Sequence, residues 1–128
     1  MTSEADLVAR WHALVSCYNG VANRLDRALQ DGHGLTRTEF ETLDRLVLCD
    51  GDKRRMQSLA GDMYLSQSAL SRAVDRLERH GLVCRVACDV DRRGVFVAPT
   101  EDGVRRHAEA RRTYLSILAE HLPPDGTR

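Results

Sequence analysis

Serine, glutamine and arginine residues gather on one side of a helix that we expect from Ser66 to His80. At about 100° per residue, the apolar side chains of this segment fall on the opposite side, where they can dock the helix to a core. Side chains of these polar types reach base edges and phosphates, and a helix fits the major groove of a duplex. The pattern favours contact with double-stranded DNA only slightly over an ordinary solvated face. The polar side comprises Gln67, Ser68, Ser71, Arg72, Asp75, Arg76 and Arg79.

A second group of cations lies at the tip of a predicted β-hairpin. The β-prone runs 82–88 and 95–98 flank a polar loop that contains Asp91, Arg92 and Arg93. Two adjacent arginines on a narrow turn can enter a minor groove, where the negative potential attracts guanidinium groups, and the aspartate can brace one of them. An ordinary polar turn is the alternative. Because this hairpin follows the polar helix directly, the two together are typical of a winged helix-turn-helix.

Two helices are expected before the basic part of the chain. Apolar residues alternate steps of four and three from Leu7 to Ala28, which predicts a long helix packed along another helix, within the chain or across a dimer. Thr36 and Glu39 have the spacing of a capping box and predict a second helix that stops near residue 50. These helices must support the segment that carries the polar side chains.

Two further helices complete the prediction. A short helix over 56–63 precedes the polar helix across a turn, and this order predicts a helix-turn-helix. Thr100 can cap a final helix that ends before two prolines. We expect that helix to bury Val104, Ala108, Leu115, Leu118 and Leu122. The fold class is therefore mainly α with a small β-hairpin, in one domain over residues 1–128.

The formal net charge of zero conceals an uneven distribution. Residues 1–52 carry 5 basic and 9 acidic groups, residues 53–93 carry 9 and 5, and residues 94–128 carry 5 and 5. All but one of the 19 basic residues are arginine, whose side chain suits bidentate contacts with phosphate and guanine. A neutral total therefore does not exclude nucleic acid. We expect Arg54 and Arg55, just before the short helix, to contact the DNA backbone.

The sequence lacks the motifs that are typical of several other classes of protein. No nucleophile elbow or zinc-protease motif occurs, so no enzyme is expected, and neither a metal site nor a cofactor is indicated by the spacing of histidines and cysteines. No apolar run approaches the roughly 20 residues of a membrane span, and the first residues do not resemble a signal peptide, so we expect a cytoplasmic protein. The cysteines are expected to be buried and without disulfides, at Cys17, Cys49, Cys84 and Cys88.

The sequence resembles the MarR family of bacterial transcription regulators over nearly its whole length. The resemblance is most specific in Leu59-Ala60, in the run from Leu65 to Glu78, in Gly81-Leu82-Val83, in Asp91-Arg92-Arg93 and in Thr100-Glu101-Asp102-Gly103. It implies an obligate homodimer in which helices 5–31 and 100–122 interlock and region 36–99 forms the winged helix-turn-helix.

The same resemblance implies roles for particular residues. Asp91 and Arg93 fill the Asp-x-Arg motif of the wing, with the arginine in the minor groove. The recognition helix is matched by Ser68, Ser71, Arg72 and Arg76. The partner implied is a pseudo-palindromic operator in double-stranded DNA, and the regulator is more often a repressor than an activator.

Regulation is also suggested by the resemblance, because many family members release DNA when a small aromatic or anionic effector binds between the dimer helices and the winged region. Candidate pocket residues are Trp11, His12, Val15 and Tyr18, for which packing in a helix seam is the alternative. Some members sense peroxide through a cysteine on the first helix, which makes Cys17 a candidate redox site, although no cation lies within one turn of it. The alternatives to a ligand-responsive repressor are thus a thiol-based redox sensor and a winged helix used for protein contacts.

Overall fold

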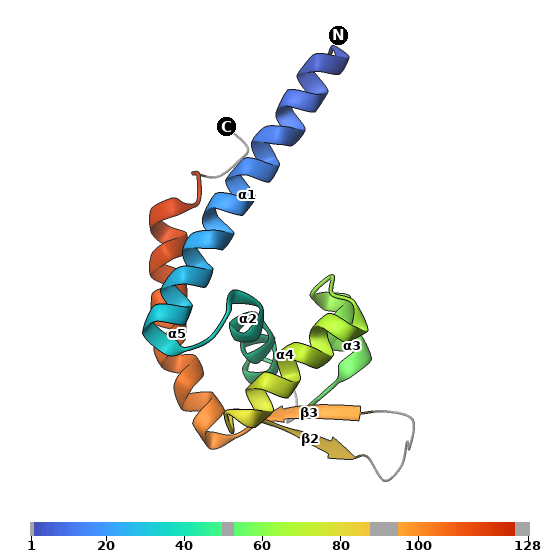
Figure 1. Cartoon of the computed structure of the whole chain (residues 1–128), viewed down its shortest axis with the longest axis vertical. Helices are drawn as coiled ribbons and strands as arrows, with labels where there is room; N and C mark the ends of the chain where they lie inside the picture. The colour runs from blue at the N-terminus through green and yellow to red at the C-terminus, as the bar shows by residue number, and fades with distance from the viewer. Residues whose placement is uncertain (1, 50–52, 88–94, 125–128) are drawn as a thin grey trace.

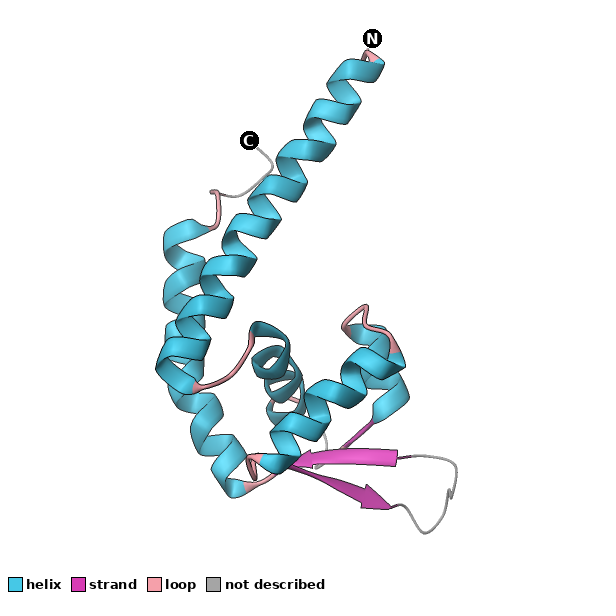
Figure 2. Ribbon diagram, in the orientation of Figure 1, coloured by secondary structure: helices cyan, strands magenta, loops and turns pink. Residues whose placement is uncertain are grey.

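Five helices and a small sheet make up the computed structural model, which describes residues 2–49, 53–87 and 95–124. The helices and strands follow one another as α1 (Glu4–His33), α2 (Arg37–Val47), β1 (Arg54–Arg55), α3 (Met56–Asp62), α4 (Gln67–Arg79), β2 (Val83–Ala87), β3 (Val95–Pro99) and α5 (Glu101–His121). Figure 2 shows the strands at one end of the molecule, next to the end of α4. The predicted fold class, mainly α with a small β-hairpin in a winged arrangement, is confirmed.

Helix boundaries follow from local capping. Thr36 Oγ1 accepts a hydrogen bond from the Glu39 amide, and the Glu39 carboxylate accepts one from the Thr36 amide, so the predicted capping box of α2 is present. The Ser66 hydroxyl caps α4 by accepting a hydrogen bond from the Ala69 amide. Gly34 ends α1 with a φ of 68°, a left-handed conformation that glycine adopts without the steric cost of a Cβ.

The sheet has three antiparallel strands in the order β1-β3-β2. The predicted hairpin forms its larger part, with Val83 opposite Pro99 and Arg85 opposite Val97. Strand β1 pairs Arg54 with Val97 and was not predicted, because two arginines carry no alternating apolar pattern. The sheet thereby joins the chain segment before α3 to the wing.

A continuous apolar core lies inside α2, α3, α4 and the sheet. Phe40 is fully buried and stacks on the His107 ring, with the ring centroids 5.6 Å apart, and its ring centroid lies 4.6 Å from that of Tyr114. Other fully buried members of this core include Leu29, Leu35, Leu43, Leu59, Leu70, Val74, Leu77 and Val97. The core holds α4 firmly against the rest of the winged region.

The burial predicted for α5 is wrong. Its buried residues are Gly103, His107 and Ala110. The predicted apolar face is exposed at Val104, Ala108, Leu115 and Leu122 and half-buried at Leu118. Periodicity identifies the apolar side of a helix, but it does not state whether that side faces the core of the same chain.

A close approach of backbones explains which side of α5 turns inward. A Cβ added at Gly103 would lie 2.0 Å from the Leu82 carbonyl oxygen. The Thr100 amide also donates to this oxygen, at 3.0 Å, so the start of α5 is fastened to the end of α4 and the start of β2. Only glycine allows the first turn of α5 to pack this closely against the backbone at Leu82.

Helix α1 is divided into a covered and an uncovered half. Its C-terminal half packs along α5 and buries Val21, Leu25 and Leu29, whereas its N-terminal half extends beyond the other elements (Figure 1). The predicted seam continues into that extension, where Leu7, Trp11, Leu14 and Tyr18 are all at least half exposed. Among the described residues, the seam therefore has a partner for only half its length.

Candidate nucleic-acid interface

The amphipathic character predicted for α4 is observed in the structure. Leu70, Ala73, Val74 and Leu77 are buried, and the opposite side exposes Gln67, Ser68, Arg72 and Arg76, with Ser71 half-buried. Arg72 makes no hydrogen bond or ion pair with any residue that the structure describes. A guanidinium group without an internal partner, on a helix fixed by a full core, is available to an anionic ligand.

Arg76 is engaged within the chain. Its Nε lies 2.8 Å from Oε2 of Glu39, a residue that is only 3% exposed. The same carboxylate completes the capping box of α2, so the contact joins α4 to the N-terminus of α2. A buried carboxylate without a partner would be costly, which explains why the arginine remains there. No local pattern predicts this pair, because 37 positions separate the two residues.

A second arginine holds two carboxylates of α4. Arg85, on β2, lies 2.7 Å from Asp75 and 2.8 Å from Glu78 through its two terminal nitrogens, and its amide also donates to Glu78. Burial acts to lower the pKa of Arg85, but the hydrogen bonds and charges of the two carboxylates outweigh it, so the pKa is raised above its ordinary value. Sequence reasoning did not single out this residue.

The two arginines expected to contact the DNA backbone have different surroundings. Arg54 bonds Ser58 and Asp62 of α3 and is only 19% exposed, so its guanidinium lies against α3. Arg55 is exposed, and its guanidinium lies over the Phe96 ring at 5.4 Å, with the Lys53 ammonium 4.8 Å from the same ring. Lys53 and Arg55 together form an exposed basic patch at the base of the wing.

The candidate wing residues Asp91, Arg92 and Arg93 lie outside the described residues. The strands that lead to them are paired up to Ala87 and Val95.

Polar contacts join α2 to α5. The Tyr114 hydroxyl donates to Glu41 at 2.7 Å, and burial together with this hydrogen bond raises the pKa of the tyrosine above its ordinary value. Asp44 Oδ1 lies 2.6 Å from His107 Nε2 and 2.7 Å from Arg111 Nη1. These contacts connect the winged region to the helix that carries the exposed apolar face.

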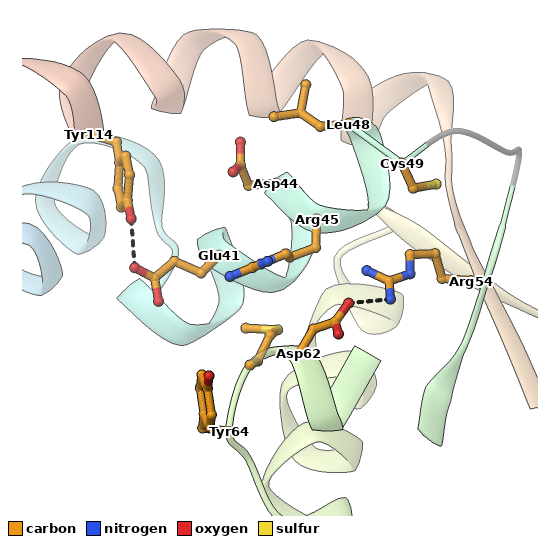
Figure 3. A pocket seen from close by; sticks show the side chains of 10 residues that line it. Glu41, Asp44, Arg45, Leu48, Cys49, Arg54, Asp62, Tyr64 and Tyr114 are labelled. Carbon is orange, nitrogen blue, oxygen red and sulfur yellow. Dashed lines mark hydrogen bonds and ion pairs between the residues drawn. The ribbon is translucent and has the colours of Figure 1, made fainter. Parts of the chain in front are cut away.

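A hollow of about 440 Å³ opens beside these contacts (Figure 3). Its wall includes Glu41 and Asp44 from α2, Asp62 from α3, and Tyr64 from the turn before α4. Figure 3 shows the Tyr114 hydroxyl directed at Glu41 and the Arg54 guanidinium directed at Asp62. Because each of the three carboxylates is already bound by a side chain of the protein, we assign no ligand to this hollow.

Two shallower hollows lie along α1. One, of about 360 Å³, is lined by Trp11, Leu14, Val15, Tyr18 and Asn19, so it brings together three of the four candidate pocket residues but not His12. The other, of about 310 Å³, lies between α1, α2 and α5 and includes Tyr18 and Cys17. Arg37, Glu41 and Tyr114 line the second hollow and were missed, since α2 and α5 bring them there from distant parts of the sequence.

The expectation that the cysteines are buried is wrong for those that the structure describes. Cys17 and Cys84 are exposed and Cys49 is half-buried, while Cys88 lies outside the described residues. Cys17 is exposed because it lies in the half of α1 that the other described elements leave mostly uncovered. Within residues 2–49, 53–87 and 95–124, no group of three histidine, cysteine or acidic side chains is placed to hold a metal ion. No helix in these ranges is long and apolar enough to cross a membrane.

Comparisons with known proteins agree with this geometry. A model described as the MarR family matches residues 35–95, from just before α2 to the first residue of β3. The crystal structure of AbsC, a MarR family transcriptional regulator from Streptomyces coelicolor, superposes with a TM-score of 0.84 at 30% identity, covering 95% of this chain and 81% of that one. The chain belongs to the MarR family. The resemblance found in the sequence is thereby confirmed.

Two further relatives widen the comparison. Sco3205, a MarR family transcriptional regulator from Streptomyces coelicolor whose structure is in complex with DNA, has a TM-score of 0.86 at 25% identity, covering 95% of this chain and 76% of that one. The HTH-type transcriptional regulator MhqR of Bacillus subtilis (strain 168) is 31% identical over 91 residues, which are 71% of this chain and 61% of MhqR. The MarR-family chain thus spans less than two thirds of that regulator. All of these relatives are described as regulators, in line with the prediction that the chain is not an enzyme.

Proposed function

We propose that this MarR-family protein is a sequence-specific regulator of transcription that binds double-stranded DNA. The observation that carries the proposal is the exposed polar side of α4, with Arg72 unpartnered among the described residues, on a helix that a buried core holds in a winged fold. Ser68, Ser71 and Gln67 offer hydrogen bonds to base edges beside it, and Arg55 offers charge to a phosphate. The related Sco3205 has been crystallised with DNA, which supports the same partner for this chain.

The functional unit is a homodimer in this proposal. Region 36–99 reads DNA, and helices 5–31 and 100–122 join the two copies. The support is the exposed apolar surface of α1 and α5, since large apolar patches on a folded chain mark interaction surfaces. A second copy would cover this surface and would supply a second α4 for the other half of a pseudo-palindromic operator.

The regulator acts as a repressor that responds to a small aromatic or anionic effector, and it works in the cytoplasm, where bacterial DNA lies. The support for an effector is the hollow between α1, α2 and α5, which combines apolar side chains with the Arg37 guanidinium. Arg37 donates to Tyr18 at 3.1 Å and forms an ion pair with Glu41. An anion in this hollow would compete for the arginine and would disturb the N-terminus of α2, to which Arg76 of α4 is joined through Glu39.

Binding is tested by measuring the affinity of arginine variants for an operator duplex over a series of salt concentrations. We expect Arg72→Ala and Arg93→Ala each to weaken binding by about 1 to 3 kcal/mol, and Arg93→Ala to lower the salt dependence. Arg45→Ala is the matched control, because Arg45 is exposed and has no ion pair among the described residues, but lies on α2. Equal binding by the Arg72 variant and the wild type would overturn the role of α4, and equal binding by the Arg93 variant would overturn the role of the wing.

A further inference from the structure

Two carboxylates lie on the exposed surface of α4, close to the residues that are proposed to bind a duplex. Asp75 follows Arg72 by three residues and Glu78 follows Asp75 by three, so Asp75 neighbours both of the other two side chains on the helix surface. The side chains of Asp75 and Glu78 are 53% and 41% exposed. Without compensation, these charges would repel phosphates near the residues that are proposed to bind them.

Arg85 compensates both charges at once. Its Nη2 binds Asp75 and its Nη1 binds Glu78, so each arm of the planar guanidinium is used on a different carboxylate. The Arg85 amide donates to the second oxygen of Glu78 at 3.2 Å. The Arg85 side chain is 30% exposed, less than the side chain of either acidic residue.

The position of Arg85 on β2 has a second consequence. Val97 of β3 lies opposite Arg85 in the sheet, and β3 also pairs with β1. The three contacts of Arg85 therefore fix α4 relative to the whole sheet as well as cancelling charge. An ordinary exposed ion pair on one helix, such as Arg105 with Asp102 on α5, does not join two elements.

We propose that Arg85 is a positioning residue for DNA binding, which acts through Asp75 and Glu78 by removing their repulsion of the duplex. This inference rests on the proposed function and adds a residue whose guanidinium is directed at carboxylates instead of at DNA. It also explains how a helix with two acidic residues on its exposed side can serve as a recognition helix.

The experiment compares operator affinities of the full-length chain by fluorescence anisotropy at low and high salt. We expect Arg85→Gln to weaken binding about tenfold at low salt, and we expect the difference to shrink as salt screens the two unpaired carboxylates. Arg105→Gln removes one positive charge from an exposed ion pair on α5 and should change the affinity less than about twofold. Circular dichroism confirms that each variant is folded, and Arg85→Lys, which keeps the charge but not the fork, should bind between the two extremes.

Removal of the carboxylates distinguishes this role from a general loss of structure. In the Arg85→Gln background, adding Asp75→Asn and Glu78→Gln should restore affinity to within about threefold of the wild type, because no charge is then left to compensate. Neutralising two exposed acids of α5 in the same background, Glu109→Gln and Glu120→Gln, should not restore it. Unchanged binding by Arg85→Gln, or a triple variant as weak as Arg85→Gln alone, would overturn the inference. A wild-type chain that binds no duplex would instead overturn the proposed function.

Discussion

The winged region and the outer helices contain similar apolar side chains in opposite environments. Around Phe40 the core is closed, and its apolar members are buried within one chain. Along the first half of α1, Leu7, Trp11 and Leu14 follow an equally regular pattern but are more than half exposed. The difference shows that contacts within one chain enclose the core of the winged region, and it supports our proposal that a second copy covers the outer helices. Variants in the two regions should therefore change different properties.

The largest effect is expected in the closed core. Replacing Phe40 with alanine removes a fully buried ring that stacks on His107 and packs against Tyr114, and the cavity left behind should lower the free energy of unfolding by about 3–5 kcal/mol. Denaturant unfolding monitored by circular dichroism measures this free energy. A loss below about 1 kcal/mol would mean that the core is not closed in this way.

A substitution in the exposed half of α1 should change dimerisation and not the fold of the single chain. Leu14→Asp places a charge on a surface that we expect to be covered only in the dimer, so it should weaken dimerisation at least about 100-fold and leave the secondary structure unchanged. Sedimentation equilibrium measures the dissociation constant. The matched control is Ser16→Asp, which introduces the same charge on the other side of the same helix. Equal dimerisation by both variants would contradict the assignment of the seam.

A variant at the contact between α5 and the winged region should have an effect of intermediate size. Gly103→Ala introduces a Cβ only 2.0 Å from the Leu82 carbonyl oxygen, and the forced displacement of α5 should lower the free energy of unfolding by about 1–3 kcal/mol. Gly32→Ala, at a helical position with no atom within 4 Å of the added Cβ, should instead be neutral or stabilising by up to about 1 kcal/mol. Thermal unfolding compares the two, and a stable Gly103→Ala variant would show that α5 does not pack this closely.

The smallest effect is expected at Cys17, which lies near the boundary between the two halves of α1. Although it is exposed, the proposal of a ligand-responsive regulator predicts that peroxide leaves operator binding unaltered. A gel-shift assay before and after peroxide treatment measures this. Loss of binding that disappears in Cys17→Ser would replace the effector proposal with thiol-based sensing.

The sequence allowed the local features to be predicted well. Thr36, Ser66 and Thr100 each begin a helix because their hydroxyls cap the next turn, and capping depends only on neighbouring residues. The buried side of α4 was also predictable, since its apolar residues recur at helical spacing and meet the core of the same chain.

Features that depend on tertiary or quaternary contacts were not predictable. The exposed face of α5 has the same periodicity as a buried one, so the pattern alone does not reveal that this face is uncovered within the chain. The pairs of Arg76 with Glu39 and of Arg85 with Asp75 and Glu78 join residues from different elements, and nothing in their local sequence distinguishes them from free arginines. Three of the five charged side chains on α4 are therefore paired with partners that only the fold reveals.

The central claim is that two copies of this chain bind one duplex through their α4 helices. The most direct measurement is selection of duplexes from a genomic library by the purified protein, followed by footprinting and determination of the number of protomers bound. We expect an enriched inverted repeat with half-sites about one helical turn apart and two protomers on each duplex. Recovery of duplexes without any inverted repeat, or a single protomer on each, would contradict the claim and favour a winged helix that binds another protein.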